Sequence, residues 1–533
     1  MPQWNANTQV RTKLFSRSPF RSDSSIQSAS ASRAALSVHK YTTRLLIVHQ
    51  VSCLFTCLRE GIFFGQSAEI EGRPASKPKF LPTSVSIEKN NQLDPVSIFS
   101  SLRSRFPGEC FLLESLEGPQ KVARYSFIGV EPISVFKSRD GIVEINGEPH
   151  EAENPYEALR MHFRSFGCGA SDIAPFSGGM VGYVGYGMVQ HFENVREKRT
   201  VDGVAPDLYF ILPKHLVCVD HLNSRMFLIS HGKTSELKDA LAEAKPLQPT
   251  ELVVGKGKSD TDEETYKKMV LEAKERILEG EIFQVVLSRR TDFRIRGDPL
   301  GMYSVLRSLN PSPYLFYLDF DHVHLLGSSP EMLVRLEGSR LNTRPLAGTR
   351  SRSADVEEDE KLKIDMLLDE KERAEHLMLV DLHRNDMGRV SKFGSVKVTE
   401  LMSVEKYSHV QHIVSNIESE LRPDCDAFDA LRSCFPAGTV TGAPKIRAME
   451  IISELEKAPR GPYGGAVGYF DFTGNMDFAI TIRSIVVSGN RASIQAGAGI
   501  VADSVPEREY AETEHKLGAT LRALASPTGG SRR

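Results

Sequence analysis

The stretch at residues 369–390, DEKERAEHLMLVDLHRNDMGRV, organises the interpretation of the whole chain. It opens with charged residues and continues into a short apolar run. Together with the apolar residues that precede it, this pattern predicts one amphipathic helix from about residue 357 to about residue 380, with an acidic outer face. Glu372 shares a helix face with Glu375 and His376, because residues three and four apart are neighbours on a helix.

Most charge runs of this kind form a solvated helix face. Here, however, the carboxylates run directly into an apolar segment that also carries two histidines. A carboxylate that enters a buried cleft needs a cation beside it, and hard oxygen ligands suit Mg²⁺. The stretch is therefore a candidate part of a magnesium site.

The composition is that of an ordinary soluble globular protein. The chain has 533 residues, a formal net charge of -3, 25% charged residues and 40% hydrophobic residues. This length suggests two to four domains, and the near-neutral charge gives no support for nucleic-acid binding. Its seven cysteines are scattered without the spacing of a zinc site, which is typical of a reducing intracellular protein.

The first sixty residues differ from the rest. They are rich in Ser and Arg, and their only acidic residues are Asp23 and Glu60. This composition is typical of an organelle transit peptide, and an unstructured leader is the alternative. The apolar segment 45–58 is shorter than the ~20 residues of a bilayer span. We expect residues 1–84 to be leader and linker and the protein to be cytoplasmic, or plastidic if the leader is a transit peptide.

Apolar runs bounded by glycine, proline and asparagine predict strands in the first half. A hairpin is expected where residues 143–145 meet Asn146-Gly147, and a helix at 155–166. The glycine-rich segment 178–187 lacks the lysine of a phosphate loop, so it predicts a tightly packed strand. The other strands are expected at 110–115, 123–132, 208–212, 215–219 and 225–230.

The second half begins with a helix that Thr261 or Asp262 can cap and that Gly280 ends. Its helices and strands follow no regular βαβ alternation, which favours an α+β fold of two packed, mostly antiparallel sheets with helices outside. A boundary at 238–258 separates an N-terminal region, 85–245, from a catalytic region, 260–526. Strands are expected at 282–288, 314–318, 323–327, 395–398, 466–471, 478–487 and 492–496, and helices from about 427, at 446–455 and at 506–524.

Five longer motifs occur in the second half: RPLAGTR at 344–350, ERAEH at 372–376 followed by Asp381, RND at 384–386, GTVTGAPK at 438–445 and AGAGIVADS at 496–504. In this order they resemble the chorismate-utilising enzymes, most closely the family of anthranilate synthase large subunits. The resemblance covers about residues 85–525 and implies the chorismate-binding enzyme fold. It also implies amination of chorismate by ammonia and elimination of pyruvate to give anthranilate, the first committed step of tryptophan biosynthesis.

The resemblance implies Mg²⁺ held by Glu375 and Glu512 and supported by Glu509. Taken alone, Glu512 would be interpreted as a surface pair with Lys516, four residues on. A bound Mg²⁺ would neutralise charge where the ring carboxylate of chorismate binds. The substrate-binding residues that the resemblance implies are Gly348, Thr349, Thr439, Tyr463, Arg483, Gly497, Ala498, Gly499 and Lys516.

The resemblance assigns the general acid to Glu331, which a dry pocket must keep protonated. His412 is the implied residue for proton transfer in the pyruvate step. Water-activating relatives have lysine where this chain has Gln284, and glutamine cannot act as a base. Aminodeoxychorismate synthases commonly have a nucleophilic lysine where this chain has Ala347. Both positions favour direct attack by ammonia.

A tryptophan feedback site is also implied. The first segment of its motif is Leu112-Leu113-Glu114-Ser115 with Ser126, and the second wall is the segment 310–316. Such a pocket needs an acceptor for the ammonium, a donor for the carboxylate and an apolar slot for the side chain. Plain strand structure is the alternative interpretation of the first segment. The residues implied are Glu114, Ser115, Ser126, Asn310, Pro311, Pro313, Tyr314, Leu315 and Phe316.

The sequence contains no glutaminase signature, so a separate glutamine amidotransferase subunit is the expected source of ammonia. Two other functions stay open at this point. One is an aminodeoxychorismate synthase component I of the folate pathway, which Ala347 disfavours. The other is a tryptophan-binding regulator without catalysis, which the complete set of carboxylates at 331, 375, 509 and 512 disfavours.

Overall fold

The computed structural model describes residues 83–88, 93–116, 124–167, 173–195, 205–248, 251–407 and 410–525. The predicted transit peptide and the apolar segment 45–58 lie outside these residues. All of these residues belong to one compact unit, Ser76–Arg533. Among the described residues, no helix combines the length and apolarity that a membrane crossing requires.

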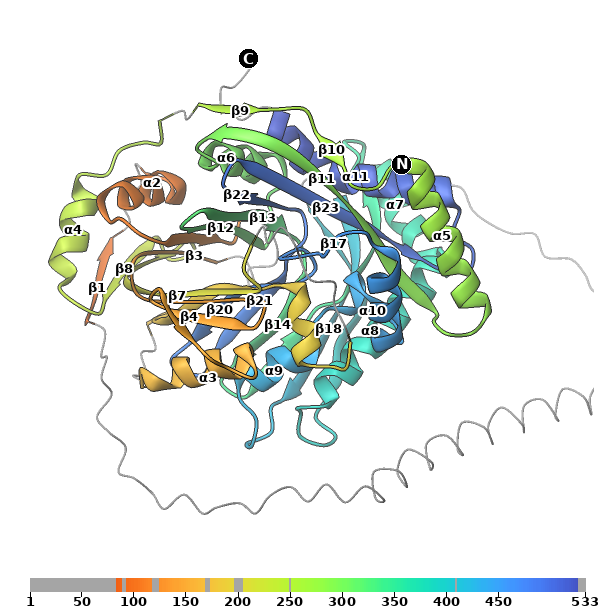
Figure 1. The fold of residues 1–533 in the computed structure, drawn as a ribbon, viewed down its shortest axis with the longest axis horizontal. Helices are drawn as coiled ribbons and strands as arrows, with labels where there is room; N and C mark the ends of the chain where they lie inside the picture. The colour runs from red at the N-terminus through yellow and green to blue at the C-terminus, as the bar shows by residue number, and fades with distance from the viewer. Residues whose placement is uncertain are drawn as a thin grey trace, which may run out of the picture. The chain divides into compact units, whose positions relative to one another are not determined.

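One continuous antiparallel sheet forms the fold and bends back on itself into two layers (Figure 1). The first layer contains, in spatial order, β11 (Gln284–Gly297), β23 (Arg491–Ile500), β22 (Ser484–Ser488), β13 (Val323–Ser329), β12 (Tyr314–Phe320) and β2 (Cys110–Glu114). Two long strands, β3 (Tyr125–Arg139) and β7 (Leu208–Asp220), continue from it into the second layer. That layer contains β6 (Gly179–Val184), β20 (Ala466–Asp471), β21 (Met476–Ile480), β14 (Met332–Glu337), β15 (Arg340–Thr343) and β18 (Val410–Glu420), with β16 (Leu346–Ser351) and β17 (Lys397–Lys406) beside β18.

Shorter strands extend the edges of this sheet. They are β1 (Thr83–Glu88), β4 (Ile142–Ile145), β5 (Glu148–His150), β8 (Arg225–Ser230), β9 (Leu252–Val254), β10 (Lys258–Ser259) and β19 (Gly442–Ala443). Strands β4 and β5 pair with each other, which confirms the predicted hairpin at Asn146-Gly147.

The sheet turns from one layer to the other where Pro132 of β3 lies opposite Pro213 of β7. Proline has no N–H to donate to a strand partner, and it occurs in sheets mainly at edges and bulges. The register shifts between Pro132 and Ser134, and Glu131 adopts a positive φ of 55°. An irregularity of this kind bends a strand and increases its twist. The pair of prolines thus explains how β3 and β7 belong to both layers.

Apolar and aromatic side chains fill the space between the layers. Phe127 and Phe316 from the first layer pack in one cluster with Tyr183, Tyr209 and Tyr469 from the second. Aromatic residues bury large areas, so a few strand positions with such side chains hold the two faces together. The predicted α+β sandwich is confirmed, with the addition that its two layers are parts of one sheet.

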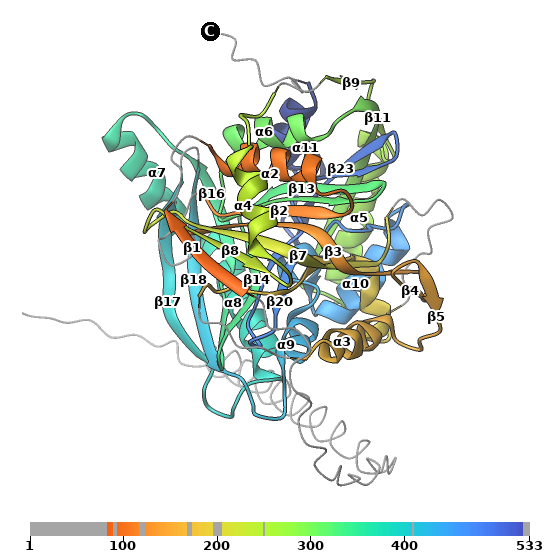
Figure 2. The ribbon, with the colours of Figure 1, turned by 90° about the vertical axis from the view of Figure 1, so that its left-hand side faces the viewer.

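The helices lie on the outside of the strands (Figures 1 and 2). They are α2 (Pro95–Arg105), α3 (Pro155–Ser165), α4 (Thr234–Ala242), α5 (Glu263–Leu278), α6 (Leu300–Leu309), α7 (Val356–Leu368), α8 (Glu370–Gly388), α9 (Ala427–Cys434), α10 (Lys445–Leu455) and α11 (Pro506–Ala525), with the 3₁₀ helices η1 (Tyr186–His191) and η2 (Gly438–Val440). Of the two predicted caps, Asp262 begins α5: its carboxylate accepts a hydrogen bond of 2.8 Å from the Thr265 N–H.

The predicted single helix at 357–380 is wrong. The chain forms two helices, α7 and α8, that meet at Asp369. The Asp369 backbone is extended, and its carboxylate accepts hydrogen bonds from the N–H groups of Lys371 and Glu372. Aspartate is a strong N-cap because its side chain satisfies N–H groups that the first turn leaves unpaired. This cap begins α8 and sets the direction of the face that carries Glu375.

Two strand predictions also need correction. The runs 208–212 and 215–219 form the single strand β7, which continues through Pro213 at the bend. The run 478–487 is instead divided into β21 and β22. The break contains Arg483, whose positive φ of 52° does not fit a strand. This conformation turns Arg483 out of the ladder and toward the candidate site.

The two predicted regions, 85–245 and 260–526, lie in the same compact unit. Strand β2 of the first region pairs with β12 of the second, and β6 pairs with β20. In the sheet, the strands of the first region are therefore hydrogen-bonded to strands of the second region on both sides. The division into an N-terminal region with the tryptophan motif and a catalytic region remains a prediction, and the strands of both regions belong to one sheet.

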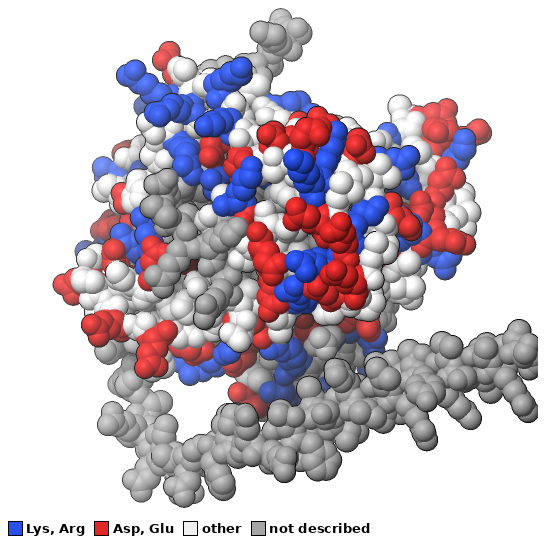
Figure 3. Space-filling model, turned by 45° about the vertical axis from the view of Figure 1, so that its right-hand side comes forward, with Lys and Arg blue, Asp and Glu red and all other residues white. Residues whose placement is uncertain are grey.

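Acidic and basic side chains are intermixed on the face shown in Figure 3. Many surface charges form ion pairs. Arg447 of α10, for example, contacts Glu281 at 2.6 Å and Glu450 at 2.7 Å. Exposed ion pairs each contribute little to stability. These pairs are therefore typical of a solvated protein surface.

Candidate active site

The candidate site lies where β11 and β23 meet helix α8. Gln284, the first residue of β11, donates a 2.8 Å hydrogen bond from Nε2 to Oε1 of Glu375 on α8. Gly499 of β23 lies opposite this pair. A Cβ at Gly499 would lie 2.7 Å from Gln284 Nε2 and 3.7 Å from Glu375 Oε1. Glycine at this position leaves room for the hydrogen bond between strand and helix.

The three predicted metal-binding carboxylates influence one another. Burial raises the pKa of Glu375 and the pKa of Glu509, and the neighbouring Glu512 carboxylate raises both further. Lys516 offsets part of this negative charge with an ion pair of 2.7 Å to Glu512. A set of carboxylate oxygens whose charges repel one another suits a hard divalent cation.

These three carboxylates are not tightly gathered in the structure. Within the described residues, only one group of at least three possible ligand atoms lies within 4.8 Å of one another, and it belongs to a different part of the fold. The i,i+4 pair between Glu512 and Lys516, which the sequence suggested as the alternative role of Glu512, is present. The donor types fit Mg²⁺, and the assignment of the ligands remains a prediction.

Glu331 lies directly before β14 and is only 4% exposed. Burial raises the pKa of its carboxyl group to about 8, and this effect outweighs the opposing influence of the Thr439 hydroxyl and the Lys516 ammonium. Its Oε1 has no hydrogen-bond partner in the described part of the protein. A carboxyl group in this environment holds its proton near neutral pH, as a general acid must.

His412 of β18 is held against β16. Its Nδ1 lies 3.0 Å from the Gly348 carbonyl and 3.0 Å from Thr349 Oγ1. Gly348 adopts a φ of +60°, at a register shift between Ala347 and Thr349 that directs this carbonyl to the ring. Burial lowers the pKa of His412 to about 4, so the imidazole is neutral near pH 7. With Nδ1–H donated to Gly348, Nε2 is the basic nitrogen.

Cationic groups from α11 and the β21–β22 break lie beside β23. The Lys516 ammonium donates a 2.9 Å hydrogen bond to the Gly497 carbonyl, and an Arg483 N–H donates one of 3.2 Å to the Lys516 carbonyl. Burial lowers the pKa of the Arg483 guanidinium. A Cβ at Gly497 would lie 3.2 Å from the Tyr463 hydroxyl. Lys516, Arg483, Tyr463 and Gly497 are thus brought together, as an anion-binding site requires.

Ala498 does not share this position. Its side chain lies on the opposite face of β23, in a core with Tyr266 of α5 and Ala448 of α10. Side chains alternate across a strand, so Gly497 and Gly499 face the site while Ala498 faces the helices. Only the backbone of Ala498 is placed to take part in binding.

Sequence reasoning missed a buried ion pair behind the site. Glu456 accepts hydrogen bonds from the N–H and hydroxyl of Ser288 on β11, at 2.7 and 2.8 Å. Arg460 pairs with Glu456 at 2.6 Å and donates to the carbonyls of Val440 and Val286. These bonds fix β11 and η2 relative to each other. The i,i+4 spacing was visible, but Pro459 between them conceals that both charges point inward.

A cavity of about 260 Å³ lies between the two sheet layers. Its walls include Phe127 and Tyr314 from the first layer and Tyr469 from the second. Polar groups are present as well: the Asp477 carboxylate accepts hydrogen bonds from the Tyr314 hydroxyl at 3.0 Å and from Arg335 at 2.9 Å. An apolar cavity with a few placed polar groups is typical of a small-molecule site.

Only some of the predicted tryptophan-binding residues line this cavity. Glu114, Ser115, Pro313, Tyr314, Leu315 and Phe316 line it, whereas Ser126, Asn310 and Pro311 do not. The Glu114 carboxylate is already engaged on the helical side, where the Tyr303 hydroxyl donates to it at 2.7 Å and Arg307 at 2.9 Å. Ser126 is buried and bonds His221 at 2.7 Å. Asp477 and Arg335, which the motif did not include, supply charge inside the cavity.

Comparison with known proteins shows what the chain is similar to. Residues 108–522 match the family described as chorismate binding enzyme. The chain is similar to anthranilate synthase component 1 of Methanothermobacter marburgensis, with 47% identity over 82% of this chain and 94% of the relative. It is also similar to aminodeoxychorismate synthase component 1 of Bacillus subtilis, with 41% identity over 78% and 91%. The crystal structure of anthranilate synthase component I from Streptococcus pneumoniae superposes with a TM-score of 0.67 and 35% identity, over 81% of this chain and 99% of that one.

Proposed function

The chain belongs to the chorismate-binding enzyme family, and from this premise we propose that it is the large subunit of an anthranilate synthase. It would aminate chorismate with ammonia and eliminate pyruvate to give anthranilate, the first committed step of tryptophan biosynthesis. The similarity to component 1 proteins of this name supports the proposal. The observation that carries it is the buried Glu331 carboxyl group, whose raised pKa of about 8 fits the acid that this reaction needs.

Amination at ring carbon two requires loss of the ring-four hydroxyl, and hydroxide is a poor leaving group. Glu331 would donate the proton that converts it to water. The Glu331 environment keeps this proton in place until the substrate arrives, because few polar groups stabilise the carboxylate. Lys516 and Arg483 would bind carboxylates of chorismate, aided by the Tyr463 hydroxyl beside Gly497.

Glu375 and Glu512 would hold Mg²⁺, with Glu509 in support. When bound, Mg²⁺ would neutralise the charge between these carboxylates and a carboxylate of the substrate. Gln284 restrains Glu375 through its hydrogen bond, and Gly499 leaves the space for both. This restraint orients one ligand from β11 before the substrate binds.

Gln284 and Ala347 define the nucleophile. Neither side chain can remove a proton from water or attack the ring, so ammonia would add directly. His412 would then take the proton in the pyruvate step through Nε2, because Nδ1 faces the Gly348 carbonyl and the ring is neutral. Ala347 disfavours the aminodeoxychorismate synthase alternative, which the similarity to the Bacillus subtilis protein keeps open.

The cavity between the layers would be the tryptophan feedback site. Its aromatic walls suit an indole ring, and the Asp477–Arg335 pair provides an acceptor for the ammonium and a donor for the carboxylate of the amino acid. Glu114 would act indirectly, because its carboxylate faces Tyr303 and Arg307. A glutamine amidotransferase subunit, anthranilate synthase component II, would supply ammonia in the cell.

Anthranilate fluorescence tests the proposal. The full chain is mixed with chorismate, Mg²⁺ and excess ammonium at alkaline pH, with and without tryptophan. Anthranilate emission that tryptophan suppresses is the expected result. Emission that tryptophan leaves unchanged would refute the feedback site alone. An aminated, nonaromatic product would identify the folate-pathway reaction instead.

A further inference from the structure

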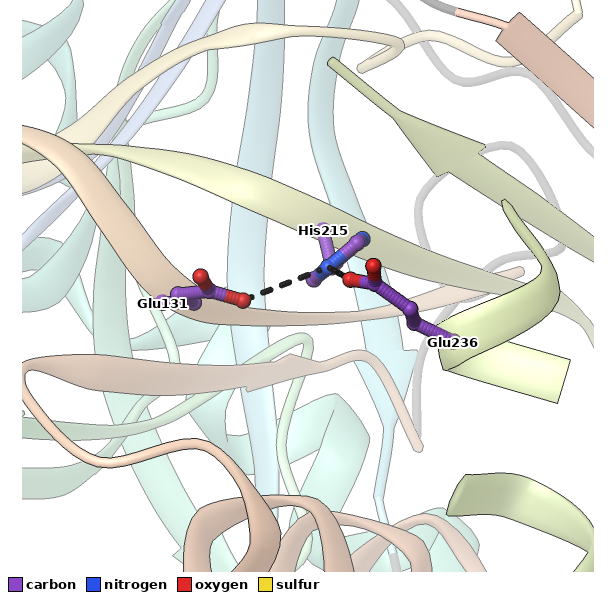
Figure 4. A group of neighbouring side chains, drawn as sticks. All are labelled: Glu131, His215 and Glu236. Carbon is purple, nitrogen blue, oxygen red and sulfur yellow. Dashed lines mark ion pairs between the residues drawn. The ribbon is translucent and has the colours of Figure 1, made fainter. Parts of the chain in front are cut away.

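A group of three possible metal ligands lies at the bend of the sheet, away from the candidate active site (Figure 4). Glu131 comes from the bend of β3, His215 from β7 and Glu236 from the first turn of α4. Strand pairing places His215 opposite Val130, next to Glu131. Their ligand atoms lie within 4.8 Å of one another.

His215 is the unusual member of the group. Its side chain is fully buried, and one face of the ring packs against Phe106. Nδ1 lies 2.9 Å from the Ser230 hydroxyl, but Nε2 makes no hydrogen bond within the described residues. Nε2 points instead toward the two carboxylates (Figure 4), 3.3 Å from Glu131 Oε2 and 3.6 Å from Glu236 Oε2. Either an N–H on Nε2 or a cation between Nε2 and the two carboxylates would satisfy this buried nitrogen.

We propose that Glu131, His215 and Glu236 bind a borderline divalent transition metal such as Zn²⁺. Tetrahedral Zn²⁺ has ligand distances of about 2.0–2.1 Å, which separates neighbouring ligand atoms by about 3.3 Å. The two distances from His215 Nε2 are close to this value. With a metal bound at Nε2, Nδ1–H would donate to the Ser230 hydroxyl, an arrangement usual for a metal-binding histidine. Both carboxylates are partly exposed, so water can complete the coordination.

Lys214 is the competitor for this site. Its ammonium lies 2.8 Å from Glu131 Oε1 and 3.5 Å from Glu236 Oε2. It therefore uses a different oxygen of Glu131 from the one that faces His215. With a neutral His215, the two carboxylates and Lys214 sum to one negative charge, which favours a further cation. Lys214 is about 29% exposed, so its flexible chain has room to move aside.

This site is distinct in chemistry from the proposed magnesium site. An imidazole nitrogen suits Zn²⁺ and its neighbours in the transition series, whereas the all-carboxylate set of Glu375, Glu509 and Glu512 suits Mg²⁺. The inference does not rest on the proposed function. A bound metal would join helix α4 to the bend that connects the two layers.

Zinc binding to the tag-free full chain tests the inference. Zn²⁺ is titrated against a competing chelator in excess Mg²⁺, which occupies the all-oxygen sites. One tightly bound Zn²⁺ per chain is expected. Glu236→Gln should weaken binding at least tenfold, and Glu236 is exposed enough for the variant to fold. Glu243→Gln, which removes an equal charge at the exposed end of α4, should leave binding unchanged.

Lys214→Met provides the opposite change. Removal of the competing ammonium should tighten zinc binding, by about tenfold, and raise the melting temperature in zinc more than in the wild type. His215→Gln should abolish the imidazole signature in zinc X-ray absorption. Zinc binding of equal strength in the wild type and in Glu236→Gln would overturn the proposal. So would the absence of bound zinc in folded wild-type protein.

Discussion

The candidate active site and the cavity between the layers differ in the side chains that form them. The candidate active site is formed by charged groups of α8 and α11. They face strand residues that are glycines, such as Gly497 and Gly499. Aromatic side chains of neighbouring strands form the second, with the Asp477–Arg335 pair as its buried charge. Glycines in a strand leave room for polar side chains of a neighbouring helix to approach a ligand. Aromatic side chains in a strand instead enclose an apolar volume. The two sites should therefore respond to different substitutions.

Glu331→Gln should have the largest effect on activity, and this effect should be confined to the active site. Glutamine keeps the size of the side chain but has no carboxyl proton to donate, so kcat with ammonium should fall about 10²- to 10⁴-fold. Anthranilate fluorescence measures this loss, and calorimetry should find unchanged tryptophan affinity. Glu400→Gln, at an exposed position of β17, is the matched control. More than a tenth of the wild-type kcat in Glu331→Gln would show that another group is the acid.

The same residue predicts a pH dependence of stability. The folded-state pKa of Glu331 is about 8, above the value of 4.5 for the unfolded chain. The folded state therefore binds the extra proton, so this contribution is complete below about pH 4.5 and is lost as the pH rises toward 8. The loss between pH 5 and 7.5 should be about 3 kcal/mol. Urea unfolding of the wild type and of Glu331→Gln should diverge by this amount over the range, and parallel curves would contradict it.

The two sites also differ in how many of their residues the sequence predicts. Glu375, Gly497 and Gly499 belong to long motifs, and the family resemblance assigns Glu331 and Lys516. The structure brings Gln284 and Glu375 into contact. Asp477 and Arg335 fall outside any motif, because their pairing follows from strands β14 and β21 that meet only after folding. Aspartate is a common helix N-cap, so the break between α7 and α8 at Asp369 could have been predicted. The apolar periodicity on both sides of Asp369 suggested one continuous helix instead.

The continuity of the sheet could not be predicted from local sequence patterns, for a similar reason. Periodicity predicts individual strands but not their partners, and β3 and β7 belong to both layers only because Pro132 and Pro213 lie opposite each other. The group at Glu131, His215 and Glu236 likewise depends on this bend. Its members are 84 and 21 residues apart in sequence, and no spacing rule connects them.

Gly499→Ala should sharpen the description of the active site. The added methyl would lie 2.7 Å from Gln284 Nε2, so the bond from Gln284 to Glu375 must break or shift. Activity should fall about tenfold and the Mg²⁺ concentration for half-maximal rate should rise, since an unrestrained ligand binds metal more weakly. Gly388→Ala, which adds the same methyl in open space on α8, is the control and should leave both values unchanged. Unchanged activity in Gly499→Ala would show that Gln284 does not orient Glu375.

Ala479→Leu should affect only the cavity between the layers. Ala479 lines this cavity of about 260 Å³ from β21, and a larger side chain would occupy the volume that an indole ring needs. The tryptophan concentration for half-inhibition should rise at least tenfold, which corresponds to about 1.4 kcal/mol, while kcat with ammonium is unchanged. Ala479→Ser, nearly equal in size to the wild type, should keep inhibition. Because Leu fills existing space, the melting temperature should fall little. Inhibition that survives Ala479→Leu would place the tryptophan site elsewhere, and a parallel loss of kcat would show that the two sites are not separable.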